Sequence, residues 1–192
     1  MNGGVGLRAG GVPTSALPAP PGRTVAAAAA PEGARGSVTP LLWLLPAMAL
    51  QSTLAALPTP LSGPLAGALP AAFELSLVQG LVALALIAGG GWLIKAAADE
   101  LDWNATPVCV DEPARALVTT GPFHLGRHPM YLGAVAVLAG TATVLGSPVA
   151  ALVAAGYAAW IDLRHARRED VALHARFGPA WRAYAARTRR WL

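Results

Sequence analysis

The sequence has little charge and one cysteine, and both shortages narrow what the chain can be. Asp, Glu, Lys and Arg make up 12% of the 192 residues, whereas 55% are hydrophobic. A soluble domain carries roughly twice that charged fraction. Cys109 is the single cysteine, so these residues can form neither an internal disulfide nor a cysteine-based metal site. The composition favours one membrane-embedded domain.

The sequence also lacks the marks of a nucleotide-binding fold. No strand-like run leads into a glycine-rich turn, and no Gly-Lys-Ser/Thr follows the three glycines at 89–91. Those glycines instead favour close packing of helices. Nucleic-acid binding is disfavoured too, because the basic residues gather in one tail of an otherwise lipid-like chain.

Four apolar segments, at about 40–57, 74–98, 129–145 and 149–163, predict transmembrane helices. Gly146, Ser147 and Pro148 predict a tight turn, which makes the last two helices an antiparallel hairpin. Residues 58–70 predict a short external connection, and residues 99–127 a long polar loop. We therefore expect an all-α integral membrane protein with about four transmembrane helices and a C-terminal cytoplasmic amphipathic helix.

The two ends of the chain set the expected orientation. Residues 1–39 are rich in Gly, Ala and Pro without apolar periodicity, which predicts a disordered leader before a domain at 40–192. Eight arginines lie between Arg164 and Arg190, and the two connections on the other side carry no Lys or Arg. This positive-inside pattern places both termini in the cytoplasm, with the protein in the cell's inner or plasma membrane.

The densest group of special residues is 117–131, which reads LVTTGPFHLGRHPMY. Gly121 and Pro122 predict a turn. Pro129 suits the first position of a helix, where its missing N–H costs nothing. Arg127, His128 and Tyr131 then cluster where a polar loop enters the membrane. The unpaired N–H groups and positive dipole of such a helix start suit a carboxylate.

The tail complements this loop. Residues 162–175 continue the fourth helix out of the membrane, with His165 and Glu169 one turn apart on one side. Gly178 predicts the end of that helix. Residues 180–187 predict a short interfacial helix anchored by Trp181 and Tyr184. The loop and the tail are expected on the same membrane face. Placing polar side chains beside apolar helices costs free energy, so a polar cluster there indicates a functional site.

Three pieces carry a family resemblance: LVTTGPF at 117–123, RHPMY at 127–131, and Glu169 to Gly178 with Tyr184 beyond. They resemble the isoprenylcysteine carboxyl methyltransferases and their relatives among phospholipid methyltransferases, over a core of about 100–190. The resemblance implies an integral membrane methyltransferase that uses S-adenosylmethionine on a lipophilic or lipidated acceptor, with membrane lipid as its surroundings. Oligomeric state stays open.

The resemblance also implies residue roles. The implied cofactor-binding residues are Arg115, Ala116, Leu117, Val118, Phe123, Arg127, His128, Pro129, Met130, Tyr131 and Glu169. The implied substrate residues are Arg164, His165 and Arg168; His165 stands where the carboxylate-binding family members have arginine. Phe123, Asp170 and Trp181 replace a usual tyrosine, glutamate and tyrosine.

The chemistry of the acceptor decides what else is needed. A carboxylate, such as that of an isoprenylcysteine-like or other small hydrophobic molecule, is ionised near neutral pH and needs no general base. An amine or a phenol needs one, and His165 or His174 is available. Two alternatives remain: an NADPH-dependent reductase of the sterol-reductase type, which has a similar C-terminal half, and a non-catalytic membrane scaffold.

Overall fold

The computed structural model describes residues 25–26, 40–56, 77–106 and 114–192. The predicted leader, apart from Val25–Ala26, and the predicted external connection lie outside this part of the chain. Strand β1 (Val25–Ala26) pairs antiparallel with β2 (Ala116–Leu117), in the register Val25 opposite Leu117. Helices make up most of the remainder.

The helices follow in chain order. The 3₁₀ turn η1 (Pro40–Trp43) leads into α1 (Leu44–Ala56). Then come α3 (Leu77–Trp103), the 3₁₀ turn η2 (Gly121–His124), α4 (Pro129–Leu145) and α5 (Pro148–Ile161). The π-helical turn η3 (Asp162–Ala166) joins α5 to α6 (Arg167–Phe177), and α7 (Pro179–Ala185) follows.

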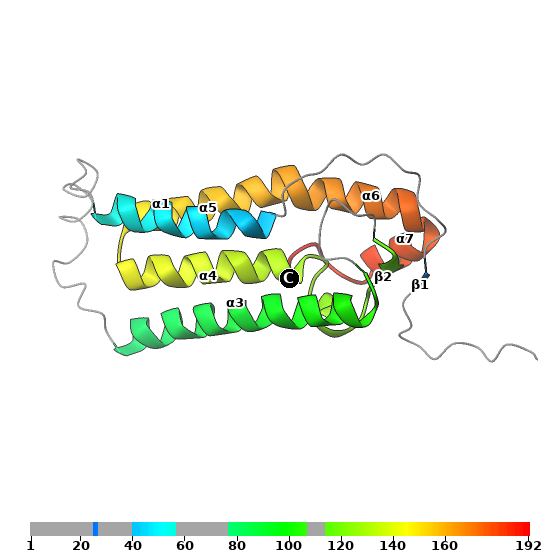
Figure 1. The fold of residues 1–192 in the computed structure, drawn as a ribbon, viewed down its shortest axis with the longest axis horizontal. Helices are drawn as coiled ribbons and strands as arrows, with labels where there is room; N and C mark the ends of the chain where they lie inside the picture. The colour runs from blue at the N-terminus through cyan, green and yellow to red at the C-terminus, as the bar shows by residue number, and fades with distance from the viewer. Residues whose placement is uncertain (1–24, 27–39, 57–76, 107–113) are drawn as a thin grey trace, which may run out of the picture.

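Helix α4 lies at the centre of the bundle (Figure 1). It packs on α3 along one side and on α5 and α1 along the other. Leu138 of α4 and Ile161 of α5 are fully buried, in a cluster that Tyr131 and Tyr157 join. Helices α6 and α7 continue beyond one end of the bundle and form a polar cap on it (Figure 1).

Glycines allow the close contact between α3 and α4. A Cβ on Gly90 would lie 2.5 Å from the carbonyl oxygen of Gly133, and a Cβ on Gly133 would lie 2.5 Å from that of Gly90. A Cβ on Gly140 would meet the carbonyl of Ala83 at 2.9 Å. The two backbones therefore touch where side chains are absent, as small residues permit in membrane helices. The predicted packing role holds for Gly90; the Cβ positions of Gly89 and Gly91 meet nothing within 4 Å.

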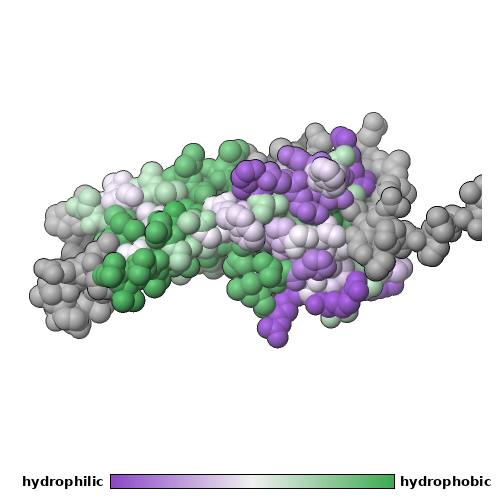
Figure 2. Space-filling view, turned by 90° about the horizontal axis from the view of Figure 1, so that it is seen from below, coloured by the Kyte–Doolittle hydropathy of each residue, from purple (hydrophilic) through white to green (hydrophobic). Residues whose placement is uncertain are grey.

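The apolar surface is that of a membrane protein. Among the described helices, α3 alone has the length and composition to cross a membrane; its 27 residues span about 40 Å. Its large apolar side chains face outward: Leu77 is 79% exposed, Leu84 62% and Trp92 64%. Hydrophobic residues gather on the bundle and hydrophilic ones on the cap (Figure 2). Leu41–Ala56 and α4 are shorter apolar helices, so four spans and the orientation stay predictions.

The structure corrects the predicted end of the second segment. The polar loop expected from residue 99 begins later, because α3 runs on to Trp103. Lys95 pairs with Asp99 at 2.7 Å, one turn apart, and nothing interrupts the helix before Ala105, which takes a φ of 49°. Charged residues can continue a helix once it has left the apolar layer.

The other predicted boundaries agree closely. Helix α4 has the expected bounds, and Gly146 and Gly178 end helices with φ values of 59° and 49°. The tail does continue the fourth helix, but through the π turn η3, which the spacing did not predict. Such turns are rare and frequently occur at functional sites.

The close backbone contact between Gly90 and Gly133 predicts how substitutions there change stability. Gly90→Ala or Gly133→Ala forces two backbones apart, and we expect it to lower the free energy of unfolding by about 1–3 kcal/mol. Gly89→Ala and Gly91→Ala are matched controls in open positions and should be neutral or slightly stabilising. Thermal unfolding in detergent measures all four. Equal changes in thermal stability for Gly89→Ala and Gly90→Ala would contradict the close contact at Gly90.

Candidate active site

The loop before α4 is fixed from both sides. Thr120 donates a hydrogen bond from its hydroxyl to Oε1 of Glu100, near the end of α3. Glu100 also lies against Gly121, where φ is 58° and a Cβ would be 2.8 Å from Oε2. From the other side, the hydroxyl of Tyr184 in α7 donates to the carbonyl of Phe123 at 2.8 Å. The turn predicted from Gly121 and Pro122 is therefore η2, held between α3 and α7.

His128 occupies the start of α4. It is the residue before the first helical position, which Pro129 takes as predicted, and it is 4% exposed. Its ring stacks on Tyr131 with centroids 5.5 Å apart and planes 10° apart. The loop and the helix start thus bring His128 and Tyr131 together, as the sequence motif predicted.

Asp170 of α6 binds three cationic side chains, two from this loop and one that follows α7. Nη2 of Arg127 lies 3.1 Å from its carboxylate, Nε2 of His128 lies 3.2 Å away, and Nε of Arg190 donates at 2.9 Å. The Asp170 side chain is 6% exposed. A buried carboxylate is stable only when paired and hydrogen-bonded. Its three partners therefore tie the loop, α6 and the end of the chain together.

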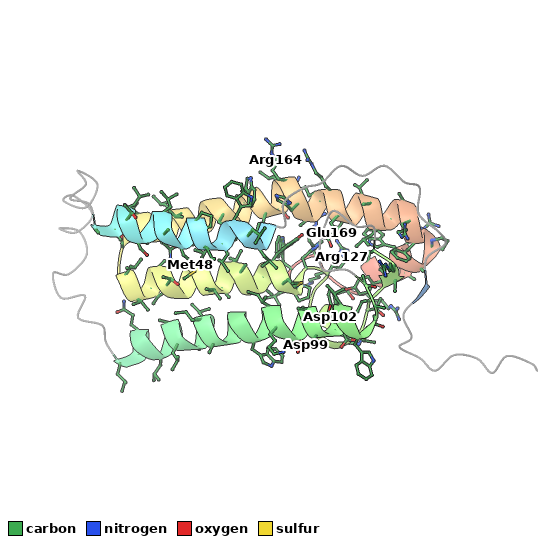
Figure 3. The ribbon with its side chains drawn as sticks, in the orientation of Figure 1. Met48, Asp99, Asp102, Arg127, Arg164 and Glu169 are labelled. Atoms are coloured by element: carbon green, nitrogen blue, oxygen red, sulfur yellow. The ribbon has the colours of Figure 1, made fainter. Side chains whose placement is uncertain are left out.

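Glu169 lies on the other side of the same imidazole. Its Oε2 is 3.5 Å from Nδ1 of His128 and is buried without a hydrogen-bond partner among the described residues. Figure 3 shows Glu169 and Arg127 pointing into the region between α6 and the start of α4. Neighbouring acids on one helix thus differ in their partners: Asp170 is fully engaged and Glu169 is not.

The two acids hold His128 as the imidazolium. Burial acts to lower the pKa of His128, but the carboxylates of Asp170 and Glu169 outweigh it and raise the pKa from 6.5 to about 9. Burial likewise acts to raise the pKa of Asp170, but hydrogen bonds from His128 and Arg190 and the charge of Arg127 lower it to about 2. At neutral pH both ring nitrogens of His128 are donors.

An apolar cluster adjoins these charges. Leu117, Val118 and Phe123 are buried with Phe177 and Tyr184, and Met130 packs against them. Arg115 is exposed and Ala116 is half-buried in β2. Trp181 also faces inward, with Arg127 lying 5.4 Å above its ring. Tyr184 is buried in this cluster and Trp181 is half-buried against it, so their predicted anchoring at the membrane interface stays a prediction.

The predicted substrate residues lie elsewhere. Arg164 and Arg168 are exposed, and Arg164 extends away from Glu169 and Arg127 (Figure 3). His165 packs edge-on against Trp160, with ring centroids 4.6 Å apart. Its partial burial and the charge of Arg168 lower its pKa. The structure therefore joins Arg127, His128, Tyr131 and Glu169 into one site and places the arginine pair on its outer edge.

Sequence reasoning missed a second aspartate and its partners. Asp162, in η3, accepts hydrogen bonds from Nε of Arg167 at 2.9 Å and from Nε1 of Trp191 at 3.1 Å. Arg190 approaches it to 3.6 Å while also holding Asp170. No spacing in the sequence connects residues 190 and 191 with 162, since the link is made by the returning chain.

Residues 78–180 match the phospholipid methyltransferase family. This range covers more than half of the chain and includes α3, the loop, α4 and both acids. The chain belongs to this family. The family is isoprenylcysteine carboxyl methyltransferase-like, so the resemblance found in the motifs is confirmed. No curated protein and no solved structure shows significant similarity.

Membership of the phospholipid methyltransferase family agrees with the exposed apolar surface of α3. Together they indicate a membrane protein and a methyltransferase-type domain. The matched range ends just before Trp181, so the contacts of Trp181, Arg190 and Trp191 belong to a part of the cap that the match does not cover.

The charge on His128 predicts how stability varies with pH. Because the folded-state pKa is raised from 6.5 to about 9, the stabilisation is complete below pH 6.5 and is lost as the pH rises through 9. At about 1.4 kcal/mol per pKa unit the loss is of the order of 3 kcal/mol. The melting temperature in detergent between pH 6.5 and 9.5 should fall for the wild type.

His128→Asn should flatten that fall. The exposed His174 offers the matched control, and His174→Asn should retain the wild-type pH profile. A profile for His128→Asn as steep as that of the wild type would show that another group carries the effect.

Proposed function

We propose that the protein transfers a methyl group from S-adenosylmethionine to a lipophilic acceptor at the end of the bundle where the loop meets α6. The single observation that carries the proposal is the buried Oε2 of Glu169, which lies 3.5 Å from His128 and makes no hydrogen bond among the described residues, in a chain of the methyltransferase family. The membrane orientation, with both termini cytoplasmic, is part of the proposal.

Several buried polar atoms of the cap and its loop lack hydrogen-bond partners in the described part of the chain, and such a cofactor could supply them. The described residues contain six buried side-chain polar atoms without a hydrogen-bond partner. Four of them lie in the cap or its loop: Nε of Arg127, Oε2 of Glu169, Nε of Arg176 and Nε1 of Trp181. Leaving such groups unpaired costs free energy, so a polar ligand is expected beside them. S-adenosylmethionine carries hydroxyl, amine and carboxylate groups that can pair with both donors and acceptors.

The two acids, Asp170 and Glu169, have different roles in this proposal. Asp170 already binds three cationic groups, so it serves to hold the loop. Glu169 has a buried oxygen available and would accept hydrogen bonds from hydroxyl or amine groups of the cofactor. Arg127 was predicted to hold a carboxylate, but its guanidinium contacts Asp170 and the carbonyl of Thr188, which leaves Nε as its available donor.

Apolar residues beside the charges would receive the rest of the cofactor. Phe123, Leu117 and Val118 form a buried wall next to the loop, and Met130 and Tyr131 begin α4 beside it. Of the remaining residues that the resemblance assigns, Arg115 is exposed, Ala116 is half-buried in β2, and Pro129 is buried at the start of α4. Their roles in binding are part of the proposal.

When bound, the cofactor supplies a methyl group on a sulfonium, which is reactive toward nucleophiles. The chain's own contribution is to orient both reactants and exclude water. A carboxylate acceptor arrives ionised and requires only positioning, which by itself can supply several kcal/mol of acceleration. The apolar surfaces of α1 and α5 lie beside the site and would hold a lipophilic acceptor near it.

In this proposal His165, which packs on Trp160 outside the cluster of His128 and Glu169, would form the substrate end, with the exposed Arg164 and Arg168 at its edge. Its lowered pKa keeps His165 neutral near pH 7. A neutral imidazole can accept a proton, so His165 suits an amine or phenol acceptor as general base. The exposed arginines suit a carboxylate. An isoprenylcysteine-like or other small hydrophobic acid is the proposed class, with the amine or phenol as the second.

The family match weighs against the alternatives. A reductase of the sterol type has a similar C-terminal half, but the matched family transfers methyl groups. A scaffold without catalysis would have no use for a buried carboxylate oxygen that makes no hydrogen bond, which costs stability.

Calorimetric titration of S-adenosylmethionine into the detergent-purified protein tests the proposal. We expect the wild type to bind and Glu169→Ala to bind about 10- to 100-fold more weakly, because hydrogen bonds to a charged group contribute about 1.5–3 kcal/mol each. Asp99→Ala is the matched control, since Asp99 is an exposed acid that, among the described residues, pairs with Lys95. Asp170→Asn should instead lower the melting temperature.

Two outcomes would count against the proposal. A folded wild-type protein that does not bind millimolar cofactor would overturn it, and a nicotinamide cofactor would be titrated next. Binding that Glu169→Ala retains in full would show that the site lies elsewhere.

A further inference from the structure

The chain returns to the candidate site after α7. Residues 188–192, which we call the strap, run beside the loop that precedes α4, and the chain end marked in Figure 1 lies at the start of that helix. The backbone N–H of Arg127 donates to the carbonyl of Arg189 at 3.0 Å. Nη1 of Arg127 donates to the carbonyl of Thr188 at 3.2 Å. The strap is thus bonded directly to the residue before His128.

Gly126 makes this crossing possible. A Cβ at this position would lie 1.8 Å from the carbonyl oxygen of Trp191, which no side chain can tolerate without movement of the strap. The backbone of Gly126 has no positive φ. Glycine is therefore required here by the closeness of the strap and not by the conformation of the loop.

Arg190 of the strap bridges two aspartates. Its Nε lies 2.9 Å from Oδ2 of Asp170, and its Nη1 lies 3.6 Å from Oδ1 of Asp162. Trp191 reinforces the bridge by donating from Nε1 to the same oxygen of Asp162 at 3.1 Å. Its ring packs against the core cluster 6.1 Å from His128. Among the described residues, Arg190 alone links the π turn η3 with the acid on α6.

We propose that Arg190 is a positioning residue, which holds Asp170 against the loop so that Glu169 stays available to the cofactor. The inference rests on the proposed function. His128 lies between the two acids, 3.2 Å from Asp170 and 3.5 Å from Glu169. Removing Arg190 takes one cation from a buried carboxylate, and Asp170 then draws Arg127 and His128 more strongly. The imidazole of His128 then shifts. The carboxylate of Glu169 moves out of line with the cofactor, although Arg190 does not contact Glu169.

The test compares neighbouring arginines. Arg190→Ala should weaken the binding of S-adenosylmethionine by about 10- to 100-fold, the size expected when binding groups are displaced by about an ångström. Arg189→Ala is the matched control, because its exposed side chain donates, within the described part of the chain, to the carbonyl of Leu192 at 3.4 Å. It should bind like the wild type. Arg190→Lys retains the charge and should restore part of the affinity.

A second variant moves the strap without removing a charge. Gly126→Ala pushes the carbonyl of Trp191 away and should weaken binding in the same direction as Arg190→Ala. Melting temperatures are recorded for every variant. A purely structural role would lower the melting temperature and leave the dissociation constant of the folded fraction unchanged, and this result would overturn the proposal.

Each remaining outcome is decisive. Wild-type affinity in folded Arg190→Ala overturns the positioning role while leaving the proposed function intact. Failure of the wild type to bind overturns the proposed function and the inference with it. If Arg190→Ala does not fold, Arg190→Lys and Gly126→Ala decide: weakened binding in both supports the role, and wild-type binding in both overturns it.

Discussion

The carboxylate of Asp170 is the point on which the cap depends. Moving an ion out of water costs several kcal/mol, and the cost is offset only when its partners are well placed. Here the partners come from two distant segments, Arg127 and His128 from the loop and Arg190 from the strap. Their convergence on one buried group fixes the loop, α6 and the strap relative to one another.

This arrangement explains why the second acid is available. Glu169 shares His128 with Asp170 but lies at the greater distance, 3.5 Å, and its buried Oε2 makes no hydrogen bond among the described residues. An acid with several close hydrogen bonds beside one whose buried oxygen makes none is the pattern expected when one group maintains structure and the other binds a ligand. The apolar wall around Phe123 completes a site with polar side chains on one side and apolar side chains on the other.

The bundle supplies the second constraint. Backbone contact between Gly90 and Gly133 fixes α3 against α4, and this fixes where α4 begins. Because α3 continues to Trp103, its Glu100 reaches the turn at Gly121. The membrane part thereby positions the loop that the cap then binds. The predicted loop at 99–103 was wrong because amphipathic continuation of a helix beyond the membrane leaves no break in the sequence.

The sequence by itself determined the local features. Pro129 sets the start of α4, Gly146 and Gly178 end helices, and the motif residues Arg127, His128 and Tyr131 cluster as expected, since backbone preferences and short spacings act over a few residues. Tertiary structure alone decided the rest: the π turn, the inward packing of Trp181, and the strap contact of Arg190. Glu169 and Asp170 point roughly 100° apart on a helix, and only the partners brought by distant segments determine which of them keeps a buried oxygen without a hydrogen bond.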